Sequence, residues 1–319
     1  MKAGVICSQG IGDVLLMMIA SHYLFSRGYQ VTTFHSASFT MRSWFPHYEF
    51  KLRSSLTNYE TMLRPYNLII LQNDNTSLAF DLIDLYKQGK INNLSVFYAS
   101  YCPNKHRSLT SWDRIFNLSY PMTDNIAQAI ASILQTTQTS KNNGLVIPPS
   151  LITHRYPKRV LIHPTTTSKD KTWPHTKFLQ VAAQLKKRGF EVVFCMSPNE
   201  RNNWFPLVGH DFKLPLFPTL ADLAAYLYES GYLIGNDSSL GHLASNLHIP
   251  TLIIGNCYKR LSLWRPGWFQ GKIITPSSWI PNVKGWRLRT KKWHHFISSR
   301  QVMSAFDALL DMHPLREKT

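Results

Sequence analysis

The sequence predicts an α/β protein of two doubly wound parallel-sheet domains that face each other across a cleft. Short apolar strand patterns alternate with helix patterns in both halves of the 319-residue chain, and a polar stretch separates the halves. Such alternation with short connections implies right-handed crossovers and therefore parallel strands. In both halves, small hydroxyl and charged residues directly follow strands, where open α/β sheets bind ligands. We expect domains at residues 1–150 and 151–319.

The first half begins with a strand, a glycine-containing turn and a helix closed by Gly28. Further along, the strongly apolar strand YNLIIL ends in the polar cluster QNDNTS. The apolar periodicity predicts strands at 3–7, 29–34, 66–71 and 95–98, and helices at 14–27, 78–87 and 124–134. The polar stretch TTQTSKNNG, followed by IPPS and THRYPKR, has the composition of an interdomain linker.

The second half restarts the alternation. Pro174 suits the first position of a helix that Gly189 stops. The expected strands are 159–163, 191–195, 232–235 and 251–254, and the expected helices are 174–188, 220–229 and 240–247. A last helix near 300–311 is expected to pack back toward the N-terminal domain.

Composition excludes several classes of protein. The hydrophobic content of 44% and the aromatic content of 13% are those of a globular protein, and no apolar run is long enough to span a membrane. Gly10, Gly12 and Asp13 interrupt what would be the apolar core of a signal peptide, so we expect a cytoplasmic protein. The four cysteines are scattered without CxxC spacing, so no metal site is expected.

The net charge of +17 favours a polyanionic partner, which can be nucleic acid, anionic lipid or a phosphorylated substrate. Residues 259–295, here called the basic Trp-rich segment, mix lysines and arginines with tryptophans. As a whole the segment suits an anionic membrane surface or single-stranded nucleic acid, although any one tryptophan is more readily explained by packing. No nucleic-acid-binding motif is present, so nucleic acid is not expected. The tryptophans are Trp264, Trp268, Trp279, Trp286 and Trp293.

A weak phosphate-turn pattern, Gly10-Ile-Gly12-Asp13, follows the first strand. It lies at the carboxyl end of that strand, where Asp13 can act as a general base toward a hydroxyl. The alternative is that Asp13 caps the helix, and the pattern alone favours the cap.

The run HPTTTSKDKTWP, residues 163–174, lies between a buried strand and a helix start. Thr166, Thr167 and the free backbone N–H groups there can bind phosphate oxygens, and Lys171 can neutralise a diphosphate. Lys169 is the rival for the lysine role. The alternative is a solvated turn, but three consecutive threonines favour the site.

A second such segment, NDSSLGHLAS, follows strand YLIGN. Asp237 can bind a sugar hydroxyl, and Ser238 and Ser239 can donate to phosphate, whereas His242 is equally explained as a core residue. Together with the first turn, these segments indicate an enzyme that uses a nucleotide-activated sugar.

The chain resembles bacterial heptosyltransferases of glycosyltransferase family 9. The resemblance rests on the start GIGDVLL, on HPTTTSKDKTWP, and on the block LADLAAYLYESGYLIGNDSSLGHLASNLHIPTLIIGN. It spans most of the chain and is most similar to the enzymes that add the first heptose to the lipopolysaccharide inner core. It implies a GT-B fold, an ADP-heptose donor and a Kdo-bearing lipid A acceptor at the cytoplasmic face of the inner membrane.

The resemblance also implies residue roles. Asp13 matches the family's catalytic base and Lys171 the lysine that stabilises departing ADP. The donor-binding residues that it implies are Thr166, Thr167, Glu200, Asp237, Ser238 and His242. Two departures are Ser239, where the family usually has glycine, and the basic Trp-rich ending after Asn256.

The expected activity is inverting transfer of L-glycero-D-manno-heptose from ADP-heptose to a Kdo or heptose acceptor of the inner core. We expect no cofactor beyond the donor, leave divalent-metal dependence open, and expect peripheral contact with the anionic inner membrane. One alternative is the same fold with another nucleotide sugar or a later core acceptor. An alternative of another class is a non-catalytic binder of anionic lipid or nucleic acid.

Overall fold

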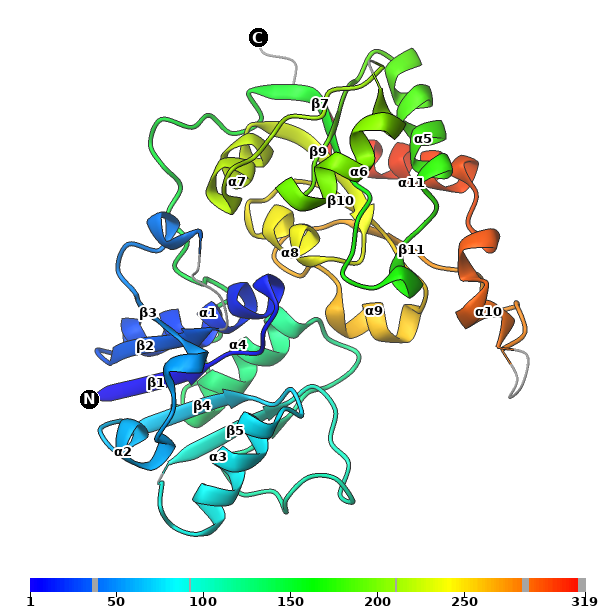
Figure 1. Ribbon diagram of the computed structural model, residues 1–319. Helices are drawn as coiled ribbons and strands as arrows, with labels where there is room; N and C mark the ends of the chain where they lie inside the picture. Colours follow the sequence, from blue (N-terminus) through cyan, green and yellow to red (C-terminus); the bar gives the residue numbers. More distant parts are fainter. Residues whose placement is uncertain (36–39, 92, 210, 283–286, 315–319) are drawn as a thin grey trace. The chain divides into compact units, whose positions relative to one another are not determined.

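The computed structural model describes residues 1–35, 40–91, 93–209, 211–282 and 287–314. The chain divides into two compact units, Met1–Ile147 and Pro148–Thr319. Each unit contains one open sheet in which every pair of neighbouring strands is parallel (Figure 1). Two parallel-sheet α/β domains were predicted from the sequence, and this prediction is confirmed. Within the described ranges, no helix combines the length and apolar character that crossing a membrane requires.

The first unit has a six-stranded sheet in the order β3-β2-β1-β4-β5-β6. Strands β2 and β3 lie on one side of β1, whereas β4, β5 and β6 lie on its other side. The carboxyl ends of β1 and β4 therefore flank the switch point at which such sheets bind ligands. The strands are β1 (Lys2–Ile6), β2 (Gln30–His35), β3 (Glu49–Leu52), β4 (Leu68–Gln72), β5 (Leu94–Tyr98) and β6 (Arg114–Ile115).

Helices cover both faces of this sheet. Alternate strand residues, among them Ile6 and Leu71, pack with Leu82 and Ile83 of α3, while α1 packs with α4 on the other face (Figure 1). This alternation follows from strand geometry, in which successive side chains point to opposite faces. The helices are α1 (Ile11–Ser26), α2 (Tyr59–Leu63), α3 (Ser77–Lys87) and α4 (Met122–Ile133).

The second unit has a five-stranded sheet in the order β11-β10-β9-β7-β8. Its switch point lies between β7 and β9, so the segments that follow these two strands are brought together. The strands are β7 (Tyr156–His163), β8 (Glu191–Phe194), β9 (Ser230–Asn236), β10 (Thr251–Ile254) and β11 (Lys272–Ile274).

One face of this second sheet is covered by α5 and α11, whose residues Phe178 and Phe306 belong to the same buried core. The apolar face of α11 fills the core of the second unit. That this final helix also packs toward the N-terminal domain stays a prediction. The helices are α5 (His175–Lys187), α6 (Pro198–Val208), α7 (Leu220–Tyr228), α8 (Ser239–Asn246), α9 (Tyr258–Trp264), α10 (Leu288–Lys291) and α11 (Ser299–Met312).

Several helix starts differ from those expected. Helix α1 begins at Ile11 with Gly10 as its N-cap, so Gly12 and Asp13 lie inside its first turn. Asp13 is therefore not the N-cap residue, but its carboxylate accepts a hydrogen bond from the Gly10 backbone at the start of the helix. Pro174 is the N-cap of α5 and not its first residue. The helix ends are as expected, because Gly28 and Gly189 follow α1 and α5 with φ of +81°, a conformation that favours glycine.

The polar stretch expected to be a linker is partly anchored. Buried Asn143 donates to the Leu15 carbonyl at 3.1 Å, and the Val146 N–H donates to the Trp44 carbonyl at 2.8 Å. Residues up to 146 therefore belong to the first unit.

The cysteines differ in accessibility. Cys7 and Cys195 are buried, and burial raises the pKa of both thiols. Cys102 is partly buried, and Cys257 is exposed as the N-cap of α9. Across the described ranges, no three histidine, cysteine or acidic side chains are placed to hold a metal ion.

Candidate functional site

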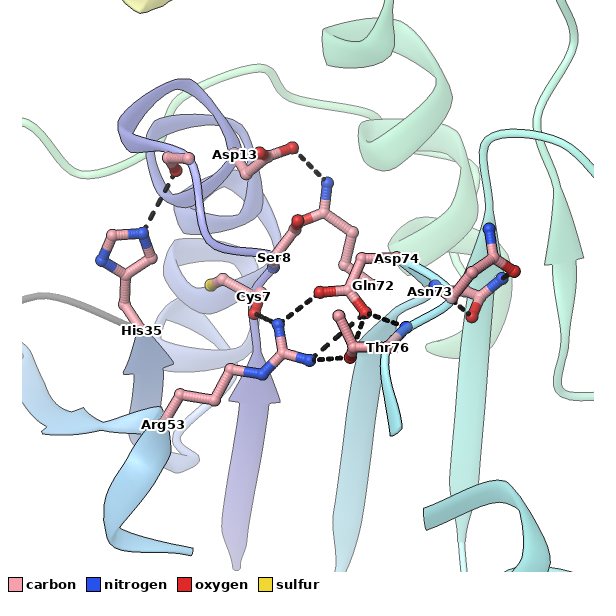
Figure 2. Close-up of polar contacts among 11 residues, drawn as sticks. Cys7, Ser8, Asp13, His35, Arg53, Gln72, Asn73, Asp74 and Thr76 are labelled. Atoms are coloured by element: carbon pink, nitrogen blue, oxygen red, sulfur yellow. Dashed lines mark hydrogen bonds and ion pairs between the residues drawn. The ribbon is translucent and has the colours of Figure 1, made fainter. Parts of the chain in front are cut away.

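The carboxylate of Asp13 reaches across the switch point of the first unit. Gln72, the last residue of β4, donates its amide to Asp13 Oδ1 at 2.7 Å (Figure 2). The carbonyl of the same side chain accepts the Ser8 backbone N–H at 3.0 Å. Gln72 is buried, so its rotamer is restrained by packing as well as by these two bonds. The carboxylate is therefore held in one position at the ligand-binding edge of the sheet.

The pKa of Asp13 is raised. Burial is the main cause, and it outweighs the hydrogen bonds from Gln72 and the Gly10 backbone and the influence of His35, all of which lower the pKa; the charge of Asp74 raises it further. A carboxylate with a raised pKa is a stronger proton acceptor when ionised. These properties suit a general base.

A buried arginine joins three loops of the first unit. Arg53 lies in the 3-10 helix Arg53–Ser55 and donates to the Cys7 carbonyl at 2.9 Å, to Asp74, and to Thr76 Oγ1 at 2.7 Å (Figure 2). Burial works against ionised Asp74, but the hydrogen bonds from Arg53 and Thr76 hold its pKa below the usual value. The arginine thus fixes the end of β1 against the loop after β4.

The bond between Gln72 and Asp13 predicts a shift in the pH profile. A Gln72→Ala variant removes a hydrogen bond that lowers the pKa of Asp13, so that pKa rises further. Because the base acts when ionised, the acidic limb of turnover against pH should move to higher pH. Rates measured across pH 4–9 test this, with Asn73→Ala as the control, since Asn73 is the next residue and bonds to Asn75 instead. An unmoved acidic limb would exclude Gln72 from positioning the base.

In the second unit, Asn236 connects the two segments that meet at the switch point. This fully buried residue ends β9, donates to the Pro164 carbonyl at 2.7 Å and accepts the Trp173 N–H at 3.0 Å. Pro164 and Trp173 lie near the two ends of the threonine- and lysine-rich run. One amide therefore sets the position of the whole run relative to β9.

The three threonines of this run have different surroundings. The Thr166 hydroxyl donates to the Ser168 carbonyl at 2.6 Å and accepts the Ser168 N–H at 3.1 Å, so it shapes the turn. Thr167 is exposed. Thr165, which we did not select from the sequence, is buried with a hydroxyl that has no hydrogen-bond partner.

The two candidate lysines lie in one short helix. Lys171 is the last residue of the 3-10 helix Lys169–Lys171 and is partly buried. The side chain of its rival, Lys169, is outside the described part of the structure.

Helix α8 begins at the carboxyl end of β9. Its N-cap is Ser238, yet the serine hydroxyl is buried without a partner and makes no capping bond. Ser239 is the first helical residue and is partly buried. His242 lies in the first turn, where burial lowers its pKa to about 4 and its Nδ1 has no partner. A buried polar atom without a partner costs free energy, so these atoms are candidates for contact with a ligand or an ordered water molecule.

Two expected donor-site residues have partners within the protein. Asp237 pairs with Arg260 of α9. Glu200 lies in the first turn of α6, where its carboxylate accepts the backbone N–H and hydroxyl of Ser197 at 3.1 and 2.6 Å in a capping box. The hydrogen bonds that the structure shows for the Glu200 carboxylate are therefore those of a helix cap.

The structure brings most of the candidate residues of each unit together. Gly10, Gly12 and Asp13 lie together at the start of α1, where Asp13 meets Gln72 of β4, and the run 164–173 meets Asn236 in the second unit. Sequence reasoning missed Gln72, Arg53, Asn236 and Arg260. Gln72 and Asn236 could have been found from the sequence, since each is the polar residue that ends an apolar strand, whereas no pattern pointed to Arg53 or Arg260.

The basic Trp-rich segment is only partly exposed. Trp293 is buried and donates its indole N–H to the Asp170 carbonyl at 2.8 Å, while Trp264 and Trp268 are partly buried. Trp279 is 93% exposed. Trp286 and Lys284 lie outside the described residues. Packing therefore accounts for Trp293, and Trp279 stays available for a surface.

Similar proteins agree with this architecture. The model of glycosyltransferase family 9 (heptosyltransferase) matches residues 114–254. Lipopolysaccharide heptosyltransferase 3 of Escherichia coli strain K12 is 27% identical over 167 residues, which cover 47% of this chain and 46% of that protein. The match thus spans about half the length of this relative.

Two solved structures share the fold over nearly the whole chain. The structure of E. coli ADP-heptose lipopolysaccharide heptosyltransferase II has a TM-score of 0.70 at 17% identity and covers 98% of this chain and 99% of its own. The structure of E. coli heptosyltransferase WaaC with ADP has a TM-score of 0.70 at 13% identity. The match covers 97% of this chain and 100% of the WaaC chain.

Two parallel-sheet α/β units, each with polar residues gathered at its switch point, define the GT-B class of glycosyltransferase folds. Over residues 114–254 the chain is similar to glycosyltransferase family 9.

Proposed function

We propose that the protein is an inverting glycosyltransferase that transfers L-glycero-D-manno-heptose from ADP-heptose to a Kdo or heptose hydroxyl of the lipopolysaccharide inner core. The observation that carries the proposal is Asp13, a carboxylate of raised pKa held by Gln72 at the switch point of the first sheet. The family match and the names of the similar proteins support the choice of sugar.

In this mechanism the acceptor hydroxyl oxygen attacks the anomeric carbon of the heptose. Its proton passes to Asp13 as the new C–O bond forms. The bond between the anomeric carbon and the phosphate oxygen breaks, and its electron pair leaves with ADP. One carboxylate suffices, since a single displacement inverts the anomeric centre without a covalent intermediate.

The second unit stabilises the leaving diphosphate. The N-terminus of α8, the hydroxyls of Thr165 and Ser238, and the ammonium group of Lys171 supply hydrogen bonds and positive charge to it. Such groups lower the barrier to the extent that they bind the developing charge more tightly than the intact donor.

A Lys171→Ala variant should lower kcat by roughly 100- to 1,000-fold, as the loss of one preorganised charged donor typically does. Lys171→Arg should recover part of the rate because it restores the charge. Steady-state kinetics test both variants, with Lys187→Ala as a control on the last turn of α5. A full rate in Lys171→Ala would transfer the role to Lys169.

The acceptor is expected at the cytoplasmic face of the inner membrane. The net charge of +17 and exposed Trp279 support peripheral contact with anionic lipid there.

Mass spectrometry of Kdo2-lipid A incubated with ADP-heptose and the purified protein tests the activity. A single added heptose, absent with Asp13→Asn, is the expected result. No product together with ADP-induced stabilisation would retain the donor site and point to another acceptor. No product and no response to ADP would overturn the proposed function.

A further inference from the structure

Arg260 occupies an unusual position for a surface arginine. It lies on α9, the helix that follows β10, and its guanidinium pairs with Asp237 directly after β9. Only 35% of its side chain is exposed, and burial lowers its pKa. Among the described residues, Asp237 is its one hydrogen-bonding partner. A guanidinium has five N–H donors, so most of these donors remain for another acceptor.

The surroundings of this pair point to an anion. Strand β9 pairs with both β7 and β10, so the segments after these three strands are neighbours. The residue after Asp237 is Ser238, whose buried hydroxyl lacks a partner. Two further unpartnered polar atoms lie on the adjoining segments, Thr165 Oγ1 and His242 Nδ1, and both residues are more than nine-tenths buried.

We propose that Arg260 is a ligand of the donor's diphosphate, positioned for this by Asp237. Asp237 fixes the guanidinium beside the N-terminus of α8. A diphosphate accepts the remaining N–H groups and the hydroxyl donors nearby, and a planar guanidinium suits phosphate geometry. This inference rests on the proposed function and names a diphosphate-binding residue for the same site.

The consequence for Asp237 is a change of role. A carboxylate paired with Arg260 is a positioning group for the cation, whereas the sequence suggested that it binds a sugar hydroxyl. The ion pair also offsets the repulsion between the carboxylate and a nearby diphosphate.

Calorimetric titration of the full chain with ADP, inorganic pyrophosphate and adenosine tests the proposal. Arg260→Ala should weaken ADP and pyrophosphate binding by about tenfold to a hundredfold and leave adenosine binding unchanged. Arg260→Lys should fall between Arg260→Ala and the wild type. Arg265→Ala is the matched control, because Arg265 ends the same helix and bonds to Ser262 instead.

A double variant separates ligand binding from charge neutralisation. If Arg260 only neutralises Asp237, then adding Asp237→Asn to Arg260→Ala restores ADP affinity, and this result would overturn the proposal. Continued weak binding in the double variant supports it. Unchanged ADP affinity in Arg260→Ala, with heptose transfer by wild type intact, would remove the Arg260 assignment alone. A wild-type protein that binds neither ADP nor pyrophosphate would remove both this assignment and the proposed function.

Discussion

An Asp13→Asn variant is expected to lose turnover by about 100- to 10,000-fold, the usual contribution of general-base catalysis. The amide keeps an oxygen that accepts the Gln72 hydrogen bond, so the local structure should persist. Donor affinity should change little, because the loss concerns proton transfer in the reaction itself. Single-turnover kinetics with ADP-heptose, together with ADP titration, measure the two effects separately.

The same variant should be at least as stable as the wild type at neutral pH. Since folding raises the pKa of Asp13, stability falls as the pH rises from the ordinary pKa of aspartate to the folded-state pKa, and above the folded-state pKa the full cost of the ionised carboxylate is present. The stabilisation of Asp13→Asn over wild type should therefore disappear below about pH 4, near the ordinary pKa of aspartate. Asp81→Asn, an exposed aspartate of α3, removes the same charge as a control. Full turnover in Asp13→Asn would show that another group takes the proton.

The second large effect is expected at Asn236. An Asn236→Ala variant leaves the Pro164 carbonyl and the Trp173 N–H buried without partners. Each buried unpaired group costs about 1–3 kcal/mol, so the free energy of unfolding should fall by about 2–6 kcal/mol. ADP binding should weaken as well, because the threonine- and lysine-rich run loses its attachment to β9. Urea unfolding and ADP titration measure the two losses.

Asn203→Ala supplies the control, since this exposed asparagine of α6 should tolerate the change with little loss of stability. A stable Asn236→Ala protein with weak ADP binding would assign the residue to the ligand site alone. A stable variant with normal ADP binding would show that neither hydrogen bond matters.

Much of the fold was predictable because buried parallel strands are apolar throughout. Strand β10 coincides with its predicted range, and β4 and β5 differ from theirs by one or two residues. The strands that the sequence did not predict, β3, β6 and β11, are short, lie at sheet edges and have partly exposed residues. An edge strand pairs with a single neighbouring strand, and only one of its faces is covered by other parts of the protein. Its sequence therefore shows little apolar pattern.

Local sequence also placed the candidate site segments, because each follows a strand. The local sequence did not reveal which polar atoms already form hydrogen bonds within the protein. The hydroxyl of Thr166 is bonded within its own turn while that of Thr165 has no partner, although both are threonines of one run. That difference depends on how the turn folds and on which neighbours it meets.

The partners of Asp13 and Asp237 come from distant parts of the chain. Gln72 lies 59 residues from Asp13, and Arg260 lies 23 residues from Asp237. Strand order brings such pairs together, and a single sequence does not specify which side chains meet. The sequence therefore placed Arg260 only within the basic Trp-rich segment and did not reveal its pairing with Asp237.

The distribution of thiols gives the protein a natural attachment point for a spectroscopic label. Cys7 and Cys195 are buried within the first and the second unit. Their raised pKa values disfavour the reactive thiolate. Cys257 is exposed three residues before Arg260, and Cys102 is the one other accessible candidate for removal. A fluorophore on Cys257 would therefore test occupancy of the proposed diphosphate site at Arg260 without an engineered cysteine.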